Sequence, residues 1–102
     1  MPPAPRRGSI VARGGRYGMV WSVADDLATV LPVERPGVPA TSGEVAIGEG
    51  PLAGMVVRAE MCRVEPVADL GVICELPAAA VCRVVLAVAR MRETQLVESR
   101  WA

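Results

Sequence analysis

The sequence predicts a mainly β protein, in which a small, strongly curved antiparallel sheet or partial barrel is followed by one C-terminal helix. Five or six short runs of aliphatic and β-branched residues follow one another between turns that contain glycine and proline. After Pro77, an alanine-rich stretch with helical spacing replaces that pattern. The 102 residues give room for one core, and we expect a single domain over residues 1–102.

The first two strands are expected at residues 9–12 and 17–23, joined as a hairpin. Between them, the sequence Arg-Gly-Gly-Arg at 13–16 provides the conformational freedom of a tight connection. Residues 1–7 contain prolines and two arginines but no apolar stretch, and we expect them to form a flexible leader.

Four more strands follow, and the first of them begins after Asp25 and Asp26, which break the pattern of the preceding strand. Pro32 falls near the end of the third strand, where proline is tolerated, and residues 34–42 form a loop before the fourth. Glu65 and Pro66 end the fifth strand, and residues 67–70 turn the chain into the last one. These four strands are expected at residues 27–33, 44–47, 55–64 and 71–75.

The fifth strand carries a pair of charges. At a period of two, Arg58 and Glu60 share one face, while Val57, Ala59 and Met61 share the face toward the core. The backbones of Arg58 and Glu60 then lie about 6–7 Å apart, so their side chains can converge on one phosphate or pair with each other. The spacing alone favours a solvated ion pair, which contributes about 0–1 kcal/mol.

The C-terminal helix is expected at residues 78–92. Pro77 stands where its fixed φ favours a helix start, and Arg90 and Arg92 fall in the last turn, where cations complement the helix dipole. Residues 93–102 are expected to form a polar tail. The core-facing stripe of the helix comprises Val81, Val84, Val85 and Val88.

The composition excludes several kinds of site. The eleven arginines and the eleven acidic residues cancel, so no global field favours nucleic acid. The absence of histidine excludes Ser–His and Cys–His nucleophile pairs and His-ligated metals. The near absence of aromatic residues argues against base-stacking platforms. We therefore expect neither a metal nor a cofactor.

The three cysteines indicate a reducing compartment. Cys62, Cys74 and Cys82 are odd in number and show no CxxC spacing, so we expect reduced, buried thiols in a cytosolic protein, with Cys62 on an exposed strand face. No apolar run approaches the roughly 18 residues of a membrane span, and no membrane contact is expected.

Five segments occur in a recognisable order: RRGSIV, RYGMVWSV, LATVLPV, GMVVRAEMCRVEP and GVICELPAAAVCRVVLAVARM. This layout, over residues 7–92, resembles the MazF/PemK growth-inhibitor toxins of bacterial toxin–antitoxin modules. The resemblance implies an SH3-like antiparallel barrel, a homodimer, a cognate antitoxin as partner and a location in the bacterial cytoplasm. It also implies a metal-independent endoribonuclease that cuts single-stranded RNA by 2′-hydroxyl attack and leaves a 2′,3′-cyclic phosphate.

The resemblance also implies site residues. In the PemK branch, a Val-Val-Arg-x-Asp-x-x-Arg segment carries an arginine and an aspartate as acid and base, and residues 56–63 match it with Arg58 and Glu60. Arg16 matches a second recurring arginine of the family. We expect Glu60 to act as general base and Arg58 and Arg16 to hold the phosphorane oxygens. The expected substrate-binding residues are Arg13, Glu34, Arg35 and Arg63.

Two departures from the family pattern favour an alternative function. Glu34 stands where the third strand of the family tends to carry a hydroxyl, and the loop between the first two strands is reduced to residues 13–16. The alternative is a catalytically degenerate, toxin-like barrel that acts as a protein-binding or regulatory module. Poisoning of DNA gyrase, as by the related CcdB toxins, has no residue-level support in the sequence.

Overall fold

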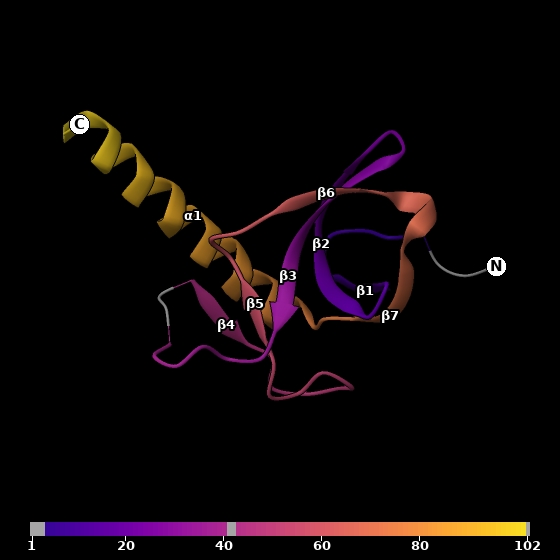
Figure 1. The fold of residues 1–102 in the computed structure, drawn as a ribbon. Coiled ribbons are helices and arrows are strands. Elements are labelled where there is room, and N and C mark those ends of the chain that lie inside the picture. The colour runs from indigo at the N-terminus through magenta and orange to yellow at the C-terminus, as the bar shows by residue number, and fades with distance from the viewer. Residues whose placement is uncertain (1–3, 41–42, 102) are drawn as a thin grey trace.

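The computed structural model describes residues 4–40 and 43–101, with side chains as far as Glu93. In this part of the chain, seven strands curl into one antiparallel sheet and a long helix follows them (Figure 1). The predicted mainly β fold with a C-terminal helix is confirmed. The elements are β1 (Ser9–Arg13), β2 (Arg16–Ala24), β3 (Leu27–Glu34), β4 (Glu44–Ala46), β5 (Val56–Arg58), β6 (Arg63–Pro66), the 3₁₀ helix η1 (Val67–Asp69), β7 (Gly71–Glu75) and α1 (Ala78–Trp101).

The sheet is organised around β3. Its strand order is β4-β5-β3-β2-β1-β7, and β6 pairs with β3 beside this path. Leu27 at the start of β3 lies opposite Pro66 of β6, while Glu34 at its end lies opposite Val56 of β5. Within the described residues the sheet does not close, because β4 and β7 remain at the two ends of the path. The end of β3 thus lies between β2 and β5.

The β1–β2 hairpin has the tight turn that the sequence predicts. Arg13 lies opposite Arg16, and Gly14 and Gly15 between them have φ angles of 56° and 78°. Positive φ at both central positions matches the right-handed twist of the strands and is accessible to glycine at little cost. The turn therefore fixes Arg16 at the first position of β2.

The strand predicted at residues 55–64 is two strands. The chain turns at Ala59 and Glu60, where the Ala59 N–H donates to the Gly43 carbonyl at 2.8 Å and the Met61 N–H to the Arg58 carbonyl at 3.4 Å. The turn interrupts the alternation, so Ala59 is buried as expected but Met61 is 51% exposed. One segment can therefore pair with the end of β3 through β5 and with its start through β6.

Two apolar clusters lie on opposite faces of the sheet. The larger one joins Ile10, Met19 and Val57 to Val84 and Val88 of α1, which confirms two of the four predicted core-facing positions. The other two, Val81 and Val85, are half-buried and lie outside this cluster. The smaller one contains four buried residues, Val11, Val20, Ala28 and Val30. Because successive side chains of a strand point to opposite faces, β1, β2 and β3 contribute to both clusters, and apolar residues cover both of their faces. This makes the middle of the sheet a rigid support for residues at its ends.

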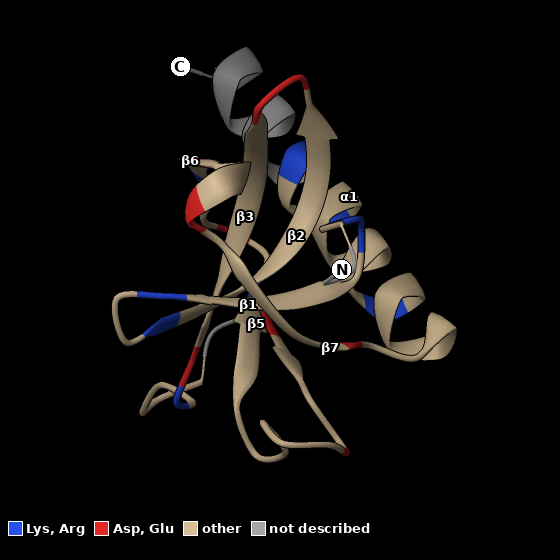
Figure 2. Cartoon of the chain, turned by 90° about the vertical axis from the view of Figure 1, so that its right-hand side faces the viewer, with Lys and Arg blue, Asp and Glu red and all other residues tan. Residues whose placement is uncertain are grey.

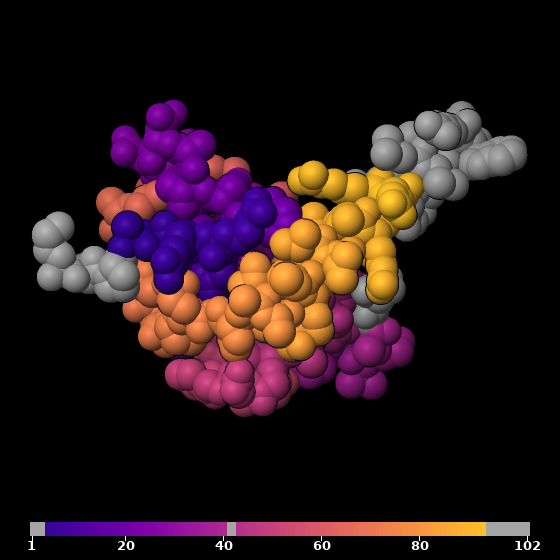
Figure 3. Space-filling model, turned by 180° about the vertical axis from the view of Figure 1, so that it is seen from behind, coloured from indigo at the N-terminus to yellow at the C-terminus, as the bar shows by residue number. Residues whose placement is uncertain are grey.

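Helix α1 is longer than predicted. It begins at Ala78, directly after Pro77, but continues to Trp101 instead of ending at Arg92. Residues 93–101 contain no glycine or proline, so nothing in the chain stops the helix. Arg90 and Arg92 therefore do not lie in its last turn. Figure 3 shows α1 lying across the back of the sheet. In the described part of the chain, no helix has the length and apolar character needed to cross a bilayer.

Two residues of the expected leader contact the sheet. The Arg7 guanidinium lies 4.3 Å from the ring centroid of Trp21, and its Nε donates to the Trp21 carbonyl at 2.8 Å. The Arg6 N–H donates to the Ser9 hydroxyl at 3.0 Å. The expected flexible leader also includes residues 1–3, which lie outside the described part of the chain. Ala102, the last residue of the expected polar tail, lies outside it as well.

The three cysteines are free, and Cys62 is exposed as expected, although it does not lie in a strand. The expectation of burial is wrong for Cys74 and Cys82. Cys62 and Cys82 are exposed and Cys74 is half-buried. Cys82 lies on α1 between the core-facing positions of its valine stripe, and Cys62 follows the turn after β5. Apolar neighbours in the sequence therefore did not indicate which way these side chains point.

Gly18 occupies a position in β2 that a larger residue would disturb. We expect Gly18→Ala to lower the free energy of unfolding by about 1–3 kcal/mol. A Cβ there would overlap Cγ1 of the fully buried Val30 and lie 3.2 Å from the Leu31 carbonyl oxygen. Urea unfolding measures the effect. Gly48→Ala is the control, because no atom lies within 4 Å of the added Cβ, and a change within about 0.5 kcal/mol is expected. Equal losses in the two variants would contradict the steric argument.

Candidate active site

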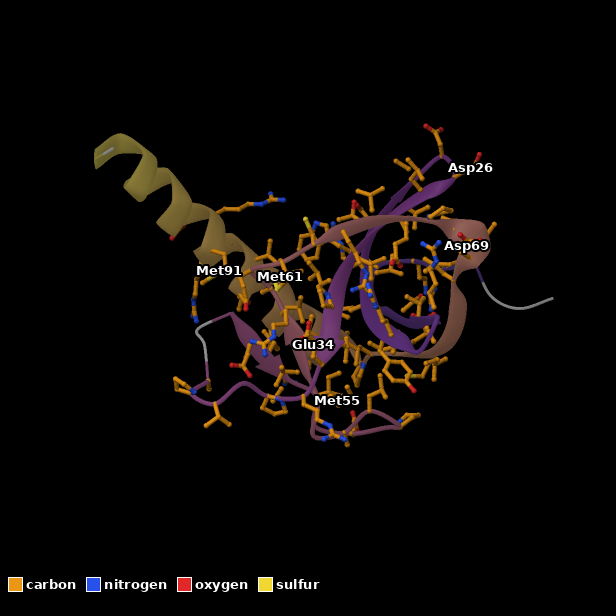
Figure 4. All side chains as sticks on the ribbon, viewed as in Figure 1. Asp26, Glu34, Met55, Met61, Asp69 and Met91 are labelled. Carbon is orange, nitrogen blue, oxygen red and sulfur yellow. The ribbon has the colours of Figure 1, made fainter. Side chains whose placement is uncertain are left out.

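A groove of about 530 Å³ lies where the β1–β2 hairpin, the end of β3 and the β5–β6 connection meet. Figure 4 shows Glu34 between Met55 and Met61 on this side of the sheet. The groove combines two arginines with one carboxylate. Its lining residues are Gly15, Arg16, Tyr17, Pro32, Val33, Glu34, Met55, Met61 and Arg63.

Arg16 contributes an accessible guanidinium to the groove. The residue is exposed, and no ion pair within the described residues involves it. Figure 2 shows basic residues on both sides of the β1–β2 turn, and these are Arg13 and Arg16. Because the glycine turn fixes the start of β2, the Arg16 side chain extends from a defined backbone position. Its full charge is available to an anion in the groove.

Arg63 is held by the protein on one side only. Its Nε donates to Glu65 Oε1 at 2.9 Å, and its Nη2 donates to the Tyr17 carbonyl at 3.4 Å. Within the described residues, its Nη1 takes part in no hydrogen bond or ion pair. Arg63 can therefore donate to a ligand from a fixed orientation.

Arg58 lies among three carboxylates. Glu34, Glu44 and Glu60 each place an oxygen 3.6 Å from one of its guanidinium nitrogens. The Arg58 side chain is only 13% exposed and that of Glu44 only 5%. The pair is therefore not the solvated one that the spacing favoured. Three negative charges and one positive charge leave this carboxylate cluster with a formal charge of −2.

The strand register explains the carboxylate cluster. Glu44 of β4 lies directly opposite Arg58 of β5, so their side chains share a face. Glu34 lies opposite Val56, two residues before Arg58 and on the same face. Glu60 reaches Arg58 from the turn that follows β5. The Glu44 carboxylate also accepts the Gly37 N–H at 2.8 Å, which ties the loop before β4 to the cluster.

Glu34 joins the groove to the carboxylate cluster. It lines the groove with Arg16 and Arg63, and it also pairs with Arg58. Glu60 pairs with Arg58 as well, but it lines a different cavity of about 160 Å³ beside α1. Of the three residues expected to be catalytic, the structure therefore brings Arg58 and Glu60 together and places Arg16 in the neighbouring groove.

The other expected site residues divide between the groove and its surroundings. Glu34 and Arg63 lie in the groove. Arg13 points to acidic residues outside it, with Nη2 3.0 Å from Asp69 and Nη1 3.9 Å from Glu65. Arg35 is exposed, and its carbonyl accepts a hydrogen bond from Arg58 Nη2 at 3.5 Å. The substrate-binding roles of Arg13 and Arg35 stay predictions.

Sequence reasoning missed two acidic residues of this region, Glu44 and Glu65. The sequence did contain a signal for Glu65: Arg63 and Glu65 are two residues apart on a strand, the same spacing that predicted the pair of Arg58 and Glu60. Glu44 carried no comparable signal, since its pairing with Arg58 depends on a register between separate strands. In the described residues, no group of acidic residues or cysteines is arranged to hold a metal ion, and Arg58 occupies the centre of the carboxylate cluster.

The structure is similar to solved structures that include MazF proteins. A MazE–MazF complex from Deinococcus radiodurans matches with a TM-score of 0.76 at 21% identity, over 89% of this chain and 98% of that chain. An endoribonuclease from a mycobacterial species matches with a TM-score of 0.76 at 19% identity, over 91% and 95% of the two chains. An endoribonuclease in complex with its cognate antitoxin, also mycobacterial, has a TM-score of 0.75 at 20% identity, over 88% and 96%.

No family model and no curated protein matches the sequence of this chain. The structural similarity nevertheless extends over almost the whole of each compared chain. At these identities it establishes a common fold, whereas activity depends on the residues of the site. The resemblance that the sequence suggested is confirmed at the level of the fold.

Proposed function

We propose that this chain, which has the fold of the MazF proteins, is the toxin of a toxin–antitoxin pair and cleaves single-stranded RNA without a metal ion. The fold likeness supports this proposal, because the compared structures include endoribonucleases and complexes with an antitoxin. The same likeness supports an antitoxin as partner. The homodimer and the bacterial cytoplasm that the sequence resemblance implies belong to the proposal as well.

The observation that carries the proposal is the meeting of Arg16, Arg63 and Glu34 in one groove. Cleavage of RNA by its own 2′-hydroxyl needs a base for that hydroxyl and cations for the phosphorane oxygens. A groove that holds one carboxylate and two guanidinium groups can supply both functions. The Arg58 guanidinium is a weaker candidate for the phosphate, because three carboxylates already surround it.

In the proposed reaction, the Glu34 carboxylate accepts the proton of the ribose 2′-hydroxyl. The 2′-oxygen attacks the adjacent phosphorus, and Arg16 and Arg63 stabilise the charge on the phosphorane oxygens. The bond from phosphorus to the 5′-oxygen then breaks, a water protonates this leaving oxygen, and the hydroxide that remains takes the proton from Glu34, which restores its carboxylate. The products are a 2′,3′-cyclic phosphate and a 5′-hydroxyl. Glu60 is the competing candidate for the base, because it shares Arg58 with Glu34.

A second candidate function is a binding module that cuts nothing. The observation that favours it is the carboxylate cluster, which adds negative charge beside the groove and makes it less attractive to phosphates. In this case the fold would hold a protein or peptide partner and regulate it. Binding of the partner would then persist in variants that lack Glu34.

A cleavage assay separates the two functions. We expect the purified chain to cut an unstructured, end-labelled RNA in the presence of EDTA and to leave 2′,3′-cyclic phosphate ends. The control substrate has the same sequence with 2′-deoxyribose throughout, and it should stay intact because it lacks the attacking hydroxyl. Expression without a partner should arrest bacterial growth. An intact RNA together with normal growth would reject the nuclease and favour the binding module.

A further inference from the structure

Glu65 is a buried carboxylate outside the groove. The residue is 8% exposed, and it belongs to β6, where it lies opposite Ala28 of β3. Its Oε1 accepts the hydrogen bond from Arg63 Nε, while its Oε2 is buried and finds no hydrogen-bond partner among the described residues. Burying a carboxylate costs free energy unless it is paired. The pairing of Glu65 with Arg63 runs through Oε1 alone and leaves Oε2 uncompensated, which points to a role beyond stability.

The contacts of Glu65 all involve arginines near the groove. Arg63 donates to it at 2.9 Å, and Arg13 Nη1 lies 3.9 Å from the same oxygen. Arg13 makes its shorter contact with Asp69, at 3.0 Å. Arg63 therefore depends on Glu65 more than Arg13 does. With Nε bound to Glu65 and one Nη2 hydrogen directed at the Tyr17 carbonyl, the Nη1 group of Arg63 and the second hydrogen of Nη2 remain for a ligand.

We propose that Glu65 is a positioning residue, which holds the Arg63 guanidinium so that Nη1 is presented to a phosphate in the groove. The inference rests on the proposed function and adds a residue that does not touch the substrate. A guanidinium fixed before binding loses less conformational freedom when the anion arrives. A carboxylate that fixes it in this way raises affinity although its own charge repels the anion.

Positioning and simple charge repulsion predict opposite effects. If Glu65 acts only through its charge, removing it makes the surroundings more positive and tightens RNA binding. If it positions Arg63, losing the acceptor weakens binding in spite of the gained positive charge. Glu65→Leu removes both the charge and the acceptor, with a side chain of similar volume. Glu65→Gln removes the charge and keeps an acceptor for Arg63 Nε.

The first test measures binding of a short 2′-O-methyl RNA, which cannot be cleaved. We expect Glu65→Leu to weaken binding about tenfold or more and Glu65→Gln to remain within about threefold of the unchanged chain. Asp69→Asn is the charge-matched control, because Asp69 contacts Arg13 and not Arg63. In an Arg63→Ala background, Glu65→Leu should cause no further loss. Tighter binding by all three single variants would overturn the inference.

The second test is independent of RNA. In ¹⁵N NMR spectra, the Nε–Hε signal of Arg63 is assigned as the one that disappears in Arg63→Lys. The two features to observe are this Nε–Hε signal and a shift of the Arg63 Nη1 signal when pyrophosphate is added. We expect both features in the unchanged chain and in Glu65→Gln, and neither in Glu65→Leu. Glu65→Ala replaces the leucine variant if circular dichroism shows that the latter is unfolded. An Arg63 signal that is unaffected by losing the acceptor would overturn the inference. An RNA that is not cleaved, with the pyrophosphate response intact, would reject only the nuclease.

Discussion

Glu34→Gln is expected to slow RNA cleavage by about 100-fold or more, the usual contribution of a general base. Glu34 is the carboxylate that shares the groove with Arg16 and Arg63, so it is the one placed to receive the proton of a bound 2′-hydroxyl. The glutamine keeps the shape of the side chain but cannot accept that proton. The rate is measured under single-turnover conditions, so that slow product release does not hide the chemical step.

Glu60→Gln is the matched control for this experiment. Glu34 and Glu60 stand equally far from Arg58, at 3.6 Å, so each substitution removes one carboxylate from the same guanidinium. Glu60 lines the cavity beside α1, and we expect its replacement to change the rate by less than about tenfold. The opposite ranking would identify Glu60 as the base, as the sequence resemblance implies, and would contradict our assignment of Glu34.

Arg58→Leu is expected to lower the free energy of unfolding by about 3 kcal/mol, at the lower end for breaking a buried ion pair. Without Arg58, the Glu44 carboxylate loses the guanidinium that lies 3.6 Å from its Oε2, while its side chain, only 5% exposed, stays largely out of water. Glu34 and Glu60 are 49% and 30% exposed, so their charges are screened by solvent and add little. Urea unfolding of the two chains measures the difference.

The double variant Arg58→Leu with Glu44→Gln tests the cause of this loss. The glutamine removes the buried negative charge and keeps an acceptor for the Gly37 N–H, which Glu44 binds at 2.8 Å. We expect it to recover about 1–2 kcal/mol of the loss. A loss below about 1 kcal/mol in Arg58→Leu itself would show that the carboxylate cluster behaves like ordinary surface ion pairs.

The fold was largely predictable because its signals are local. Glycines at 14 and 15 marked the hairpin, Pro77 marked the start of α1, and the spacing of Val84 and Val88 identified the helix face toward the core. The end of α1 was not predictable from the arginines at 90 and 92, since favourable charges do not stop a helix that lacks a breaker.

The candidate site was predictable only in part. Arg58 and Glu60 were paired correctly, because two charges two apart in sequence remain neighbours in a strand or in a turn. The other carboxylates around Arg58 were not predicted, because Glu34 and Glu44 reach it through the pairing registers of β3 and β4 with β5. Such registers depend on long-range pairing, which no short segment specifies.

The tight β1–β2 turn has a consequence for how an anion would be captured. Its two glycines leave no extended loop, and Arg13 on one side is anchored to Asp69 while Arg16 on the other faces the groove. The β1–β2 side of the rim is thus in place before any ligand arrives, and this turn carries no extended flap to fold over the groove. Capture of an anion by Arg16 should then proceed as a single step whose rate follows collision and ionic strength, because the β1–β2 turn does not have to become ordered first.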